Sequence, residues 1–159
     1  MTNKKARDSS VEPPAAAQTS TKSAASDASL LASFMRISLV LTGMKTLDAD
    51  LAEAYFQSAR GNLNAKLDAL LTHFDDLVTN GRDPVAAVRE AILPDKEDGP
   101  SAKLILLLWY TGGIQTPDKD WEVQSADRYY RALVWEAVGA HPPTLSNGYF
   151  GHWKYPPES

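Results

Sequence analysis

Three histidines and the carboxylates near them are the side chains of this sequence best suited to acid–base or metal chemistry. His73 precedes Asp75 and Asp76 in a helix-like stretch, and residues two positions apart on a helix face different directions. We therefore expect His73 at the boundary of the core rather than as a base. His141 and His152 lie far apart in a segment with several Pro and Gly residues, whereas a metal site needs three or four ligands in fixed geometry. We expect no catalytic and no metal-binding residue on this chain.

Motifs that bind cofactors or activate nucleophiles are also missing from the sequence. Gly112-Gly113 lacks the glycine spacing of a dinucleotide-binding turn, and no phosphate-binding Gly-x-x-x-x-Gly-Lys-Ser/Thr motif occurs. Residues 145–148 do not match the Gly-x-Ser-x-Gly turn that presents a catalytic serine. The 159 residues include no cysteine, which excludes a disulfide, a thiolate nucleophile, a thiolate zinc site and an iron–sulfur cluster. We therefore expect no cofactor-binding residue.

Charge and hydropathy argue against nucleic-acid and membrane partners. The formal net charge is -4 and no stripe of Lys and Arg is present, so the chain is poorly suited to phosphates or to an anionic membrane surface. The longest apolar run, residues 104–110, is about a third of the roughly 20 residues that span a bilayer. The basic start of the chain is followed by Ala, Ser, Thr and Pro rather than by the apolar segment of a secretory signal. We expect no direct membrane insertion.

Apolar spacing and helix-ending residues predict the elements that must position these residues. The predicted fold is all-α, a single compact domain of five or six helices over residues 29–139, with a disordered tail at 1–28 and an extended arm at 140–159. The tail has no aromatic and few large apolar residues, so its burial could not offset the entropy of ordering it. The predicted helices cover residues 27–42, 48–61, 63–79, 83–93, 101–111 and 125–138.

The apolar run at residues 104–110 suits either a buried strand or a buried helix, because periodicity cannot separate the two over so few residues. We favour a helix, since Ser101 can cap it and Gly112-Gly113 can end it. No second strand candidate offers a partner, and an isolated strand is not stable. The aromatic residues of this run are expected in the core more often than at a cofactor.

The arm combines helix-breaking prolines with four aromatic residues, Tyr149, Phe150, Trp153 and Tyr155. A disordered tail would be depleted in aromatics, so docking on another chain is favoured over folding back onto the domain and over disorder. Burying three such side chains contributes roughly 5–9 kcal/mol, and ordering the arm and forming a complex cost at least as much. A complex would therefore also need an apolar helical face, which Leu39 and Met44 of the first helix could supply.

Residues 34–47 read Phe-Met-Arg-Ile-Ser-Leu-Val-Leu-Thr-Gly-Met-Lys-Thr-Leu, and residues 106–112 form an apolar run that ends in Trp-Tyr-Thr-Gly. Further on come Tyr130-x-Ala132-Leu133 and an aromatic arm that contains Trp153. In this order the segments resemble the small (gamma) subunit of bacterial FAD-dependent sugar dehydrogenases, the sorbitol, glucose and fructose dehydrogenase complexes. The resemblance covers about residues 30–157, and its first two segments together are fairly specific.

The resemblance implies an accessory role without catalysis. In that family a large subunit holds FAD and oxidises the sugar, a cytochrome c subunit often passes electrons to the membrane, and the small subunit is required for maturation and export of the large one. We therefore expect a heterodimer with an FAD-containing large subunit, with a cytochrome c subunit as a further member in some complexes. The residues expected at the partner interface are Phe34, Met35, Leu39, Met44, Trp109, Tyr110, Tyr149, Phe150, Trp153 and Tyr155.

Two departures from the family pattern bear on localisation and assembly. Many relatives carry a twin-arginine signal, which implies the periplasmic side of the inner membrane, whereas no such signal appears in this sequence, which favours the cytoplasm. Some relatives have a cysteine in the arm, and its absence here excludes a covalent tie to a partner. The sequence does not indicate which sugar is oxidised. It also leaves open a stand-alone helical binding protein and a small enzyme that uses His73 or His152.

Overall fold

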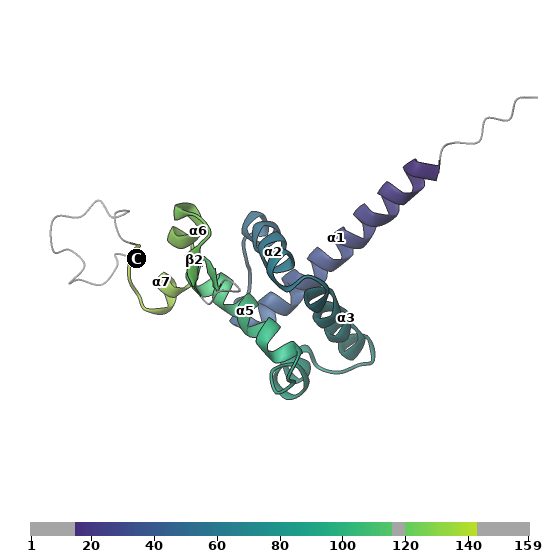
Figure 1. Ribbon diagram of the computed structural model, residues 1–159. Coiled ribbons are helices and arrows are strands. Elements are labelled where there is room, and N and C mark those ends of the chain that lie inside the picture. The colour runs from purple at the N-terminus through teal and green to yellow at the C-terminus, as the bar shows by residue number, and fades with distance from the viewer. Residues whose placement is uncertain (1–14, 116–119, 143–159) are drawn as a thin grey trace, which may run out of the picture.

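A computed structural model of the protein describes residues 15–115 and 120–142, with side chains from Ser26 onward (Figure 1). Two short strands, β1 (Gly113–Gln115) and β2 (Trp121–Val123), pair as an antiparallel hairpin. Most other described residues are helical, which confirms the predicted all-α class with the hairpin as a small addition. The helices are α1 (Ala15–Thr42), α2 (Ala49–Leu63), α3 (Ala65–Thr79), α4 (Pro84–Ala86), the π-helix η1 (Ala87–Ile92), α5 (Asp98–Thr111), α6 (Ala126–Tyr130) and α7 (Val134–Ala137).

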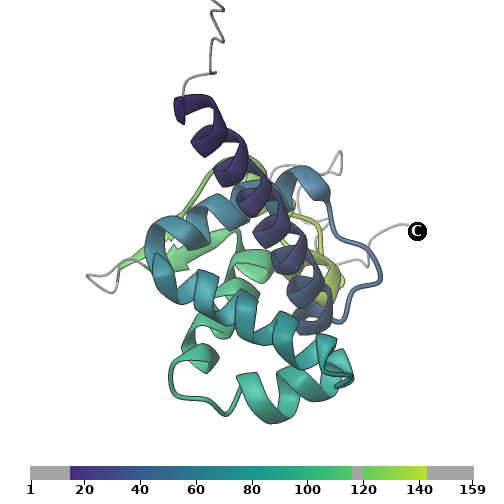
Figure 2. The ribbon, with the colours of Figure 1, turned by 90° about the vertical axis from the view of Figure 1, so that its right-hand side faces the viewer.

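Four helices, α1, α2, α3 and α5, surround the core (Figures 1 and 2). The C-terminal half of α1 packs against the other three, and its N-terminal half projects away from them (Figure 2). The largest fully buried side chains come from all four helices and from η1: Phe34, Ile37, Tyr55, Phe56, Leu67, Leu70, Leu71, Phe74, Ile92, Ile105, Leu108 and Trp109. Each helix therefore buries one apolar stripe, as the 3.6-residue period requires.

Local sequence signals place several helix ends where they are predicted. The Asp48 carboxylate accepts a hydrogen bond from the Leu51 amide at 2.9 Å, and Asp83 caps α4 in the same way at 2.9 Å. Gly112 follows α5 with a φ of 66°, a left-handed conformation that glycine adopts without strain. Such caps satisfy backbone groups that a helix end leaves unpaired, which is why α2, α4 and α5 have the predicted cap or stop.

Two predicted helix starts are wrong. α1 begins at Ala15, so the part of the predicted tail from 15 to 28 is helical, while residues 1–14 lie outside the described residues. This Ala-rich stretch has high helix propensity and only extends a helix that the buried residues further along already nucleate. α5 begins at Asp98 rather than after Ser101, whose hydroxyl donates to the Glu97 carbonyl oxygen at 3.3 Å inside the helix.

The last predicted helix, residues 125–138, is broken into α6 and α7. At the break the Leu133 amide donates to the Trp109 carbonyl oxygen at 2.9 Å, and Ala132 is buried. In an unbroken helix that amide would bond four residues back along its own chain. A contact with α5 therefore replaces a helical hydrogen bond, and Ser125 caps only α6, by accepting from the Arg128 amide at 3.1 Å.

The β-hairpin is absent from the sequence prediction. Its register pairs Gly113 with Val123 and Gln115 with Trp121. The Trp121 ring lies against Gly113, where a Cβ atom would come within 2.7 Å of it, so only glycine leaves room for the indole. The signal that could have found this hairpin is two short runs of strand-forming residues on either side of Pro117-Asp118, a pair typical of turns.

Gly112→Ala is expected to lower the free energy of unfolding by about 2 kcal/mol or more, because φ is 66° and the new Cβ would lie 2.6 Å from the Arg128 carbonyl oxygen. Gly61→Ala is the matched control. Gly61 lies inside α2 with nothing within 4 Å of its Cβ position, so alanine should raise the free energy of unfolding by about 0.5–1 kcal/mol. Urea denaturation followed by circular dichroism measures both changes. An equal effect of the two variants would contradict the close approach at Gly112.

Candidate partner-binding surface

The C-terminal ends of α1 and α5 meet the segment between α6 and α7. The Tyr110 hydroxyl donates to the carbonyl oxygen of Thr42, the last residue of α1, at 3.4 Å. The Arg131 guanidinium pairs with Asp48, at the start of α2, at 2.6 Å. With the hydrogen bond to the Trp109 carbonyl, these contacts bring together three regions that are distant in sequence: residues 42–48, 109–110 and 131–133. Their junction lies away from the projecting N-terminal half of α1 (Figure 1).

Asp48 joins two elements of this junction, because one carboxylate oxygen caps α2 and the other pairs with Arg131. The hydrogen bond from the Leu51 amide, and then Arg131, hold the pKa of Asp48 below its ordinary value. Because the folded pKa is lowered, the resulting stability is present above the unfolded pKa and is lost as the pH falls through the folded one. At neutral pH the carboxylate is ionised and holds both partners.

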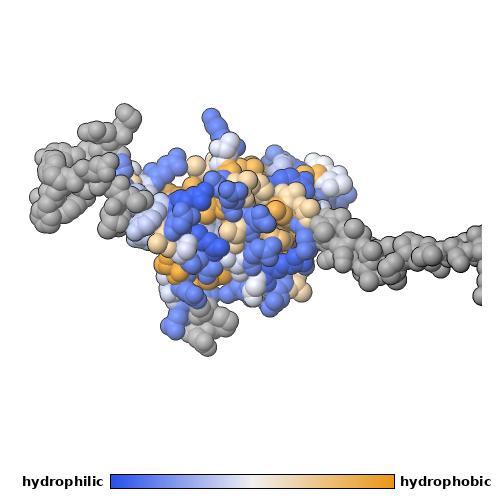
Figure 3. All heavy atoms as spheres, turned by 90° about the horizontal axis from the view of Figure 1, so that it is seen from above, coloured by the Kyte–Doolittle hydropathy of each residue, from blue (hydrophilic) through white to orange (hydrophobic). Residues whose placement is uncertain are grey.

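Apolar side chains of α1 and α5 stay partly exposed beside the junction. Leu39 and Met44 flank the end of α1, and Leu106 and Tyr110 lie one turn apart on α5; all four are half-buried. Leu107, next to Leu106, is 44% exposed. We name these five residues the α1–α5 seam. On the face that Figure 3 shows, hydrophobic residues form patches between hydrophilic ones.

Phe34 and Trp109, both predicted at the partner interface, belong to the core instead. Phe34 is 0% exposed and lies edge-on to Phe56, with ring centroids 5.7 Å apart. Trp109 is 2% exposed and lies edge-on to Tyr55 at 5.0 Å. Both side chains are on the inward stripe of their helices, so they have no surface to offer a partner. For these two residues the prediction is wrong.

The other predicted interface residues lie in the seam, at the edge of the core or outside the described residues. Leu39, Met44 and Tyr110 belong to the seam, and Met35 is half-buried and packs against the edge of the core. Four lie outside the described residues and stay predictions: Tyr149, Phe150, Trp153 and Tyr155.

A second apolar surface lies on the hairpin, which was not predicted from the sequence. Trp121 and Val123 of β2 are 47% and 42% exposed, and they share one face of the hairpin because they are two residues apart on a strand. Asn62 of α2 donates to the Gln115 carbonyl oxygen at 3.1 Å, which places the hairpin beside α2. The exposed face is therefore carried on an element that the helical core supports.

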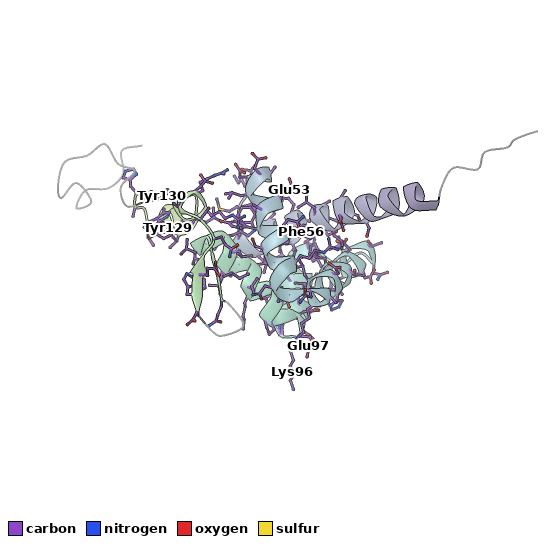
Figure 4. The ribbon with its side chains drawn as sticks, turned by 45° about the horizontal axis from the view of Figure 1, so that its top comes forward. Glu53, Phe56, Lys96, Glu97, Tyr129 and Tyr130 are labelled. Atoms are coloured by element: carbon purple, nitrogen blue, oxygen red, sulfur yellow. The ribbon has the colours of Figure 1, made fainter. Side chains whose placement is uncertain are left out.

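An aromatic cluster connects α6 to α7. Tyr129 lies edge-on to Trp135 with centroids 5.2 Å apart and contacts Tyr130 at 6.0 Å. The Trp135 indole N–H donates to the Tyr129 carbonyl oxygen at 2.7 Å. These rings are half-buried, and Figure 4 shows Tyr129 and Tyr130 on the far side of the molecule from the N-terminal half of α1. The cluster folds the two short helices against each other at the same end as the junction.

Tyr55 and Arg128 meet where α6 approaches α2. The Arg128 guanidinium lies over the Tyr55 ring, 5.7 Å from its centroid. The Tyr55 side chain is fully buried, and its hydroxyl has no hydrogen-bond partner among the described residues. Burial raises the pKa of Tyr55 to about 12, because the phenolate would be poorly solvated, and the positive charge of Arg128 offsets only part of this.

A model of the family described as membrane-bound, FAD-containing D-sorbitol dehydrogenase matches residues 5–157. The chain belongs to this family. The match covers the helical core, the junction and the predicted arm, and it confirms the resemblance to sorbitol dehydrogenase subunits. A search of curated proteins finds no match. Among the described residues of this sorbitol dehydrogenase family member, no helix has the length and apolar character needed to cross a membrane.

The glycine pair of this family member does not form the dinucleotide-binding turn of a βαβ unit. Gly112-Gly113 connects a helix to a strand, whereas a dinucleotide-binding turn connects a strand to a helix. The two described strands are antiparallel, so they form no βαβ unit. Within residues 15–115 and 120–142, no three His, Cys, Asp or Glu side chains are grouped so that they could hold a metal ion.

His73 and Asp75 point to different neighbours, as their spacing predicts. The His73 Nδ1 atom lies 2.6 Å from an Asp98 carboxylate oxygen, and the imidazole is exposed. Asp75 pairs with Arg36 at 2.8 Å and accepts a hydrogen bond from the Ser33 hydroxyl. Each side chain links α3 to another helix. His73 and Asp75 therefore form no base–carboxylate pair with each other.

Tyr55→Phe is expected to leave the free energy of unfolding at pH 7 unchanged or slightly higher, because it removes a buried hydroxyl without a described partner. The folded pKa is raised, so the stability tied to the neutral phenol is complete below the unfolded pKa of about 10 and is lost as the pH rises toward about 12. Denaturation between pH 8 and 12 should show a steep decline for the natural chain and a shallower one for Tyr55→Phe. Identical alkaline profiles would contradict the assignment.

Proposed function

We propose that this chain is a non-catalytic accessory subunit of an FAD-dependent sugar dehydrogenase of the sorbitol type. It binds an FAD-containing large subunit through the α1–α5 seam together with the arm at 140–159. The observation that carries the proposal is the group of partly exposed apolar side chains on α1 and α5, in a chain that belongs to the FAD-containing sorbitol dehydrogenase family. Exposed apolar patches of this kind are typical of protein–protein contacts.

The proposal includes the role of the partner. The large subunit holds FAD and oxidises the sugar, and the accessory chain shields apolar surface of that subunit and supports its maturation and export. A cytochrome c subunit is a further member of the complex in some relatives. On this proposal the mature complex works at the periplasmic side of the inner membrane, in keeping with a family described as membrane-bound.

The energetics favour a surface made of several parts. Complete burial of one leucine or tyrosine side chain contributes roughly 1.5–3 kcal/mol, while association costs about 4–15 kcal/mol in lost freedom of motion. The seam residues are already half-buried, so each has only part of that contribution left. The seam and the aromatic arm together can offset the cost of association, whereas either one alone leaves a weak complex.

Co-expression with an FAD-containing large subunit of a sorbitol-type dehydrogenase tests the proposal. A tag on this chain should retain the flavoprotein, and the purified complex should show FAD absorbance and reduce an artificial electron acceptor with a sugar substrate. Flavoprotein produced alone should give less soluble and less active material. Recovery of two independent and fully active proteins would overturn the proposal and favour a stand-alone helical binding protein.

Leu39→Ser combined with Leu107→Ser is expected to weaken binding of the flavoprotein by about tenfold to a hundredfold, because both changes remove apolar contact area from the seam. Val85→Ser is the matched control, since Val85 is 50% exposed but lies on α4, outside the seam. Biolayer interferometry with the purified flavoprotein measures the dissociation constants, and circular dichroism verifies the fold. An equal loss for the control would show that general stability, not the seam, is affected.

His73→Ala and His152→Ala address the remaining alternative, a small enzyme that uses these side chains. We expect the dehydrogenase activity of the complex to be unchanged in both variants, because catalysis belongs to the large subunit. Steady-state kinetics of the purified complex measures this. A loss of turnover with unchanged binding of the flavoprotein would assign chemistry to this chain.

A further inference from the structure

The last described part of the chain is attached to the helices with little apolar burial. We name β1, β2, α6 and α7, residues 113–115 and 120–142, the C-terminal module, and α1 to α5 with η1 the helical body. Among the described residues of the module, the buried apolar side chains are Ile114 and Ala132. The helical body, in contrast, buries large side chains from each of its four long helices. Elements with few buried apolar contacts open more readily than the core they rest on.

Polar contacts of one residue compensate for this shortage. Arg128 Nη1 donates to the Ser58 hydroxyl of α2 at 2.9 Å and to the Gln124 side-chain oxygen at 3.0 Å. The Ser58 hydroxyl is also 2.9 Å from the same oxygen of Gln124. The guanidinium in addition lies over the ring of Tyr55. Arg128 thus joins α6, the end of the hairpin and α2 through a single side chain.

The backbone of Arg128 makes a second contact with the helical body. Its carbonyl oxygen is so close to Gly112 that a Cβ atom there would be 2.6 Å away. The side chain of Arg128 therefore binds the body, and its backbone approaches the end of α5 closely. Displacement of α6 breaks both contacts at once.

The other contacts between the module and the helical body are weaker than those of Arg128. The Arg131–Asp48 ion pair is 2.6 Å long, but its side chains are 39% and 45% exposed, and exposed pairs contribute little. The hydrogen bond from the Leu133 amide to the Trp109 carbonyl oxygen fixes one point between α6 and α7. Neither contact holds the hairpin, which is linked to the body by the buried Ile114 and by the hydrogen bonds of Gln124 and Asn62.

We propose that the C-terminal module opens as a unit separate from the helical body and that Arg128 is the positioning residue that keeps it closed. The closed module sets the direction in which the chain leaves toward the arm and orients the aromatic cluster beside the seam. The consequence for the large subunit rests on the proposed function: the flavoprotein binds the closed form. The opening equilibrium itself is a property of this chain alone.

Hydrogen exchange of the full-length chain, followed by mass spectrometry, tests the proposal directly. In the natural chain, amides of the module should exchange faster than those of α2, α3 and α5. Arg128→Ala should raise exchange in the module by about tenfold, the effect of losing hydrogen bonds to a charged group, with exchange in the body unchanged. Arg128→Lys, which keeps the charge but not the planar donor group, should fall between the two.

Arg82→Ala is the matched control, because it removes an exposed arginine that pairs with Glu90 at 2.9 Å within the helical body. It should leave exchange in the module unchanged. Equal protection of module and body in the natural chain would overturn the proposal, as would an Arg128→Ala effect spread evenly over the whole chain. Because Arg128→Lys is a mild change, it keeps the test decisive even if the alanine variant folds poorly.

Binding of the flavoprotein supplies a second readout that separates this inference from the proposed function. Arg128→Ala should weaken binding by about the same factor by which it opens the module, since the competent population falls in proportion. Unchanged binding despite an opened module would overturn only the link to the partner. No binding by the natural chain, with module exchange as expected, would overturn the proposed function and leave the opening unit standing.

Discussion

Phe34, Ile37 and Ser38 of α1 are completely buried where this helix crosses α2, α3 and α5. Two more small polar residues of α1, Ser33 and Thr42, are buried as well, and their hydroxyls bond backbone oxygens one turn back. The other elements are placed by this packing: α5 lies along α1, and its end therefore reaches Thr42. With this orientation fixed, Leu39 of α1 and Leu106 and Leu107 of α5 stay partly exposed. The seam is thus a consequence of the core.

The core also determines which aromatic residues are left for a partner. Trp109 and Phe34 fill the space between helices. Among the described residues, the apolar surface therefore includes the medium-sized side chains of the seam, Val85, Val138 and two residues on the hairpin. Such a surface still has area to bury on assembly. It suits a subunit that meets its partner after folding, because the most exposed aromatic side chain described within residues 26–115 and 120–142 is Trp121, at 47%.

Features set by neighbours in sequence could be predicted, and features set by distant contacts could not. Asp48, Asp83 and Gly112 act within one turn of a helix, so their residue types alone indicated the helix ends. The break at 131–133 depends on the Trp109 carbonyl, and the room for Trp121 depends on Gly113 across the hairpin. Neither partner is visible from local spacing. For the candidate surface, the sequence singled out Leu39 and Met44 of the first helix, and both are half-buried in the structure, while their binding of a partner stays a prediction. Phe34 and Trp109, also expected at the interface, are buried because the other helices pack on them.

The same reasoning explains how a weakly attached module can still serve a specific contact. A partner that binds only the closed form adds its own binding free energy to closure, in proportion to the logarithm of its concentration over the dissociation constant. Polar contacts such as the hydrogen bond from Arg128 to Ser58 then suit this role better than a larger apolar contact, because they fix the orientation of the module and still allow it to open. On the proposed function, the free chain keeps its helical body and the geometry of its last elements is completed on assembly. An apolar attachment of equal strength would need larger side chains at positions such as Ala132 and Gly112, and at Gly112 the Arg128 carbonyl oxygen leaves no space for one.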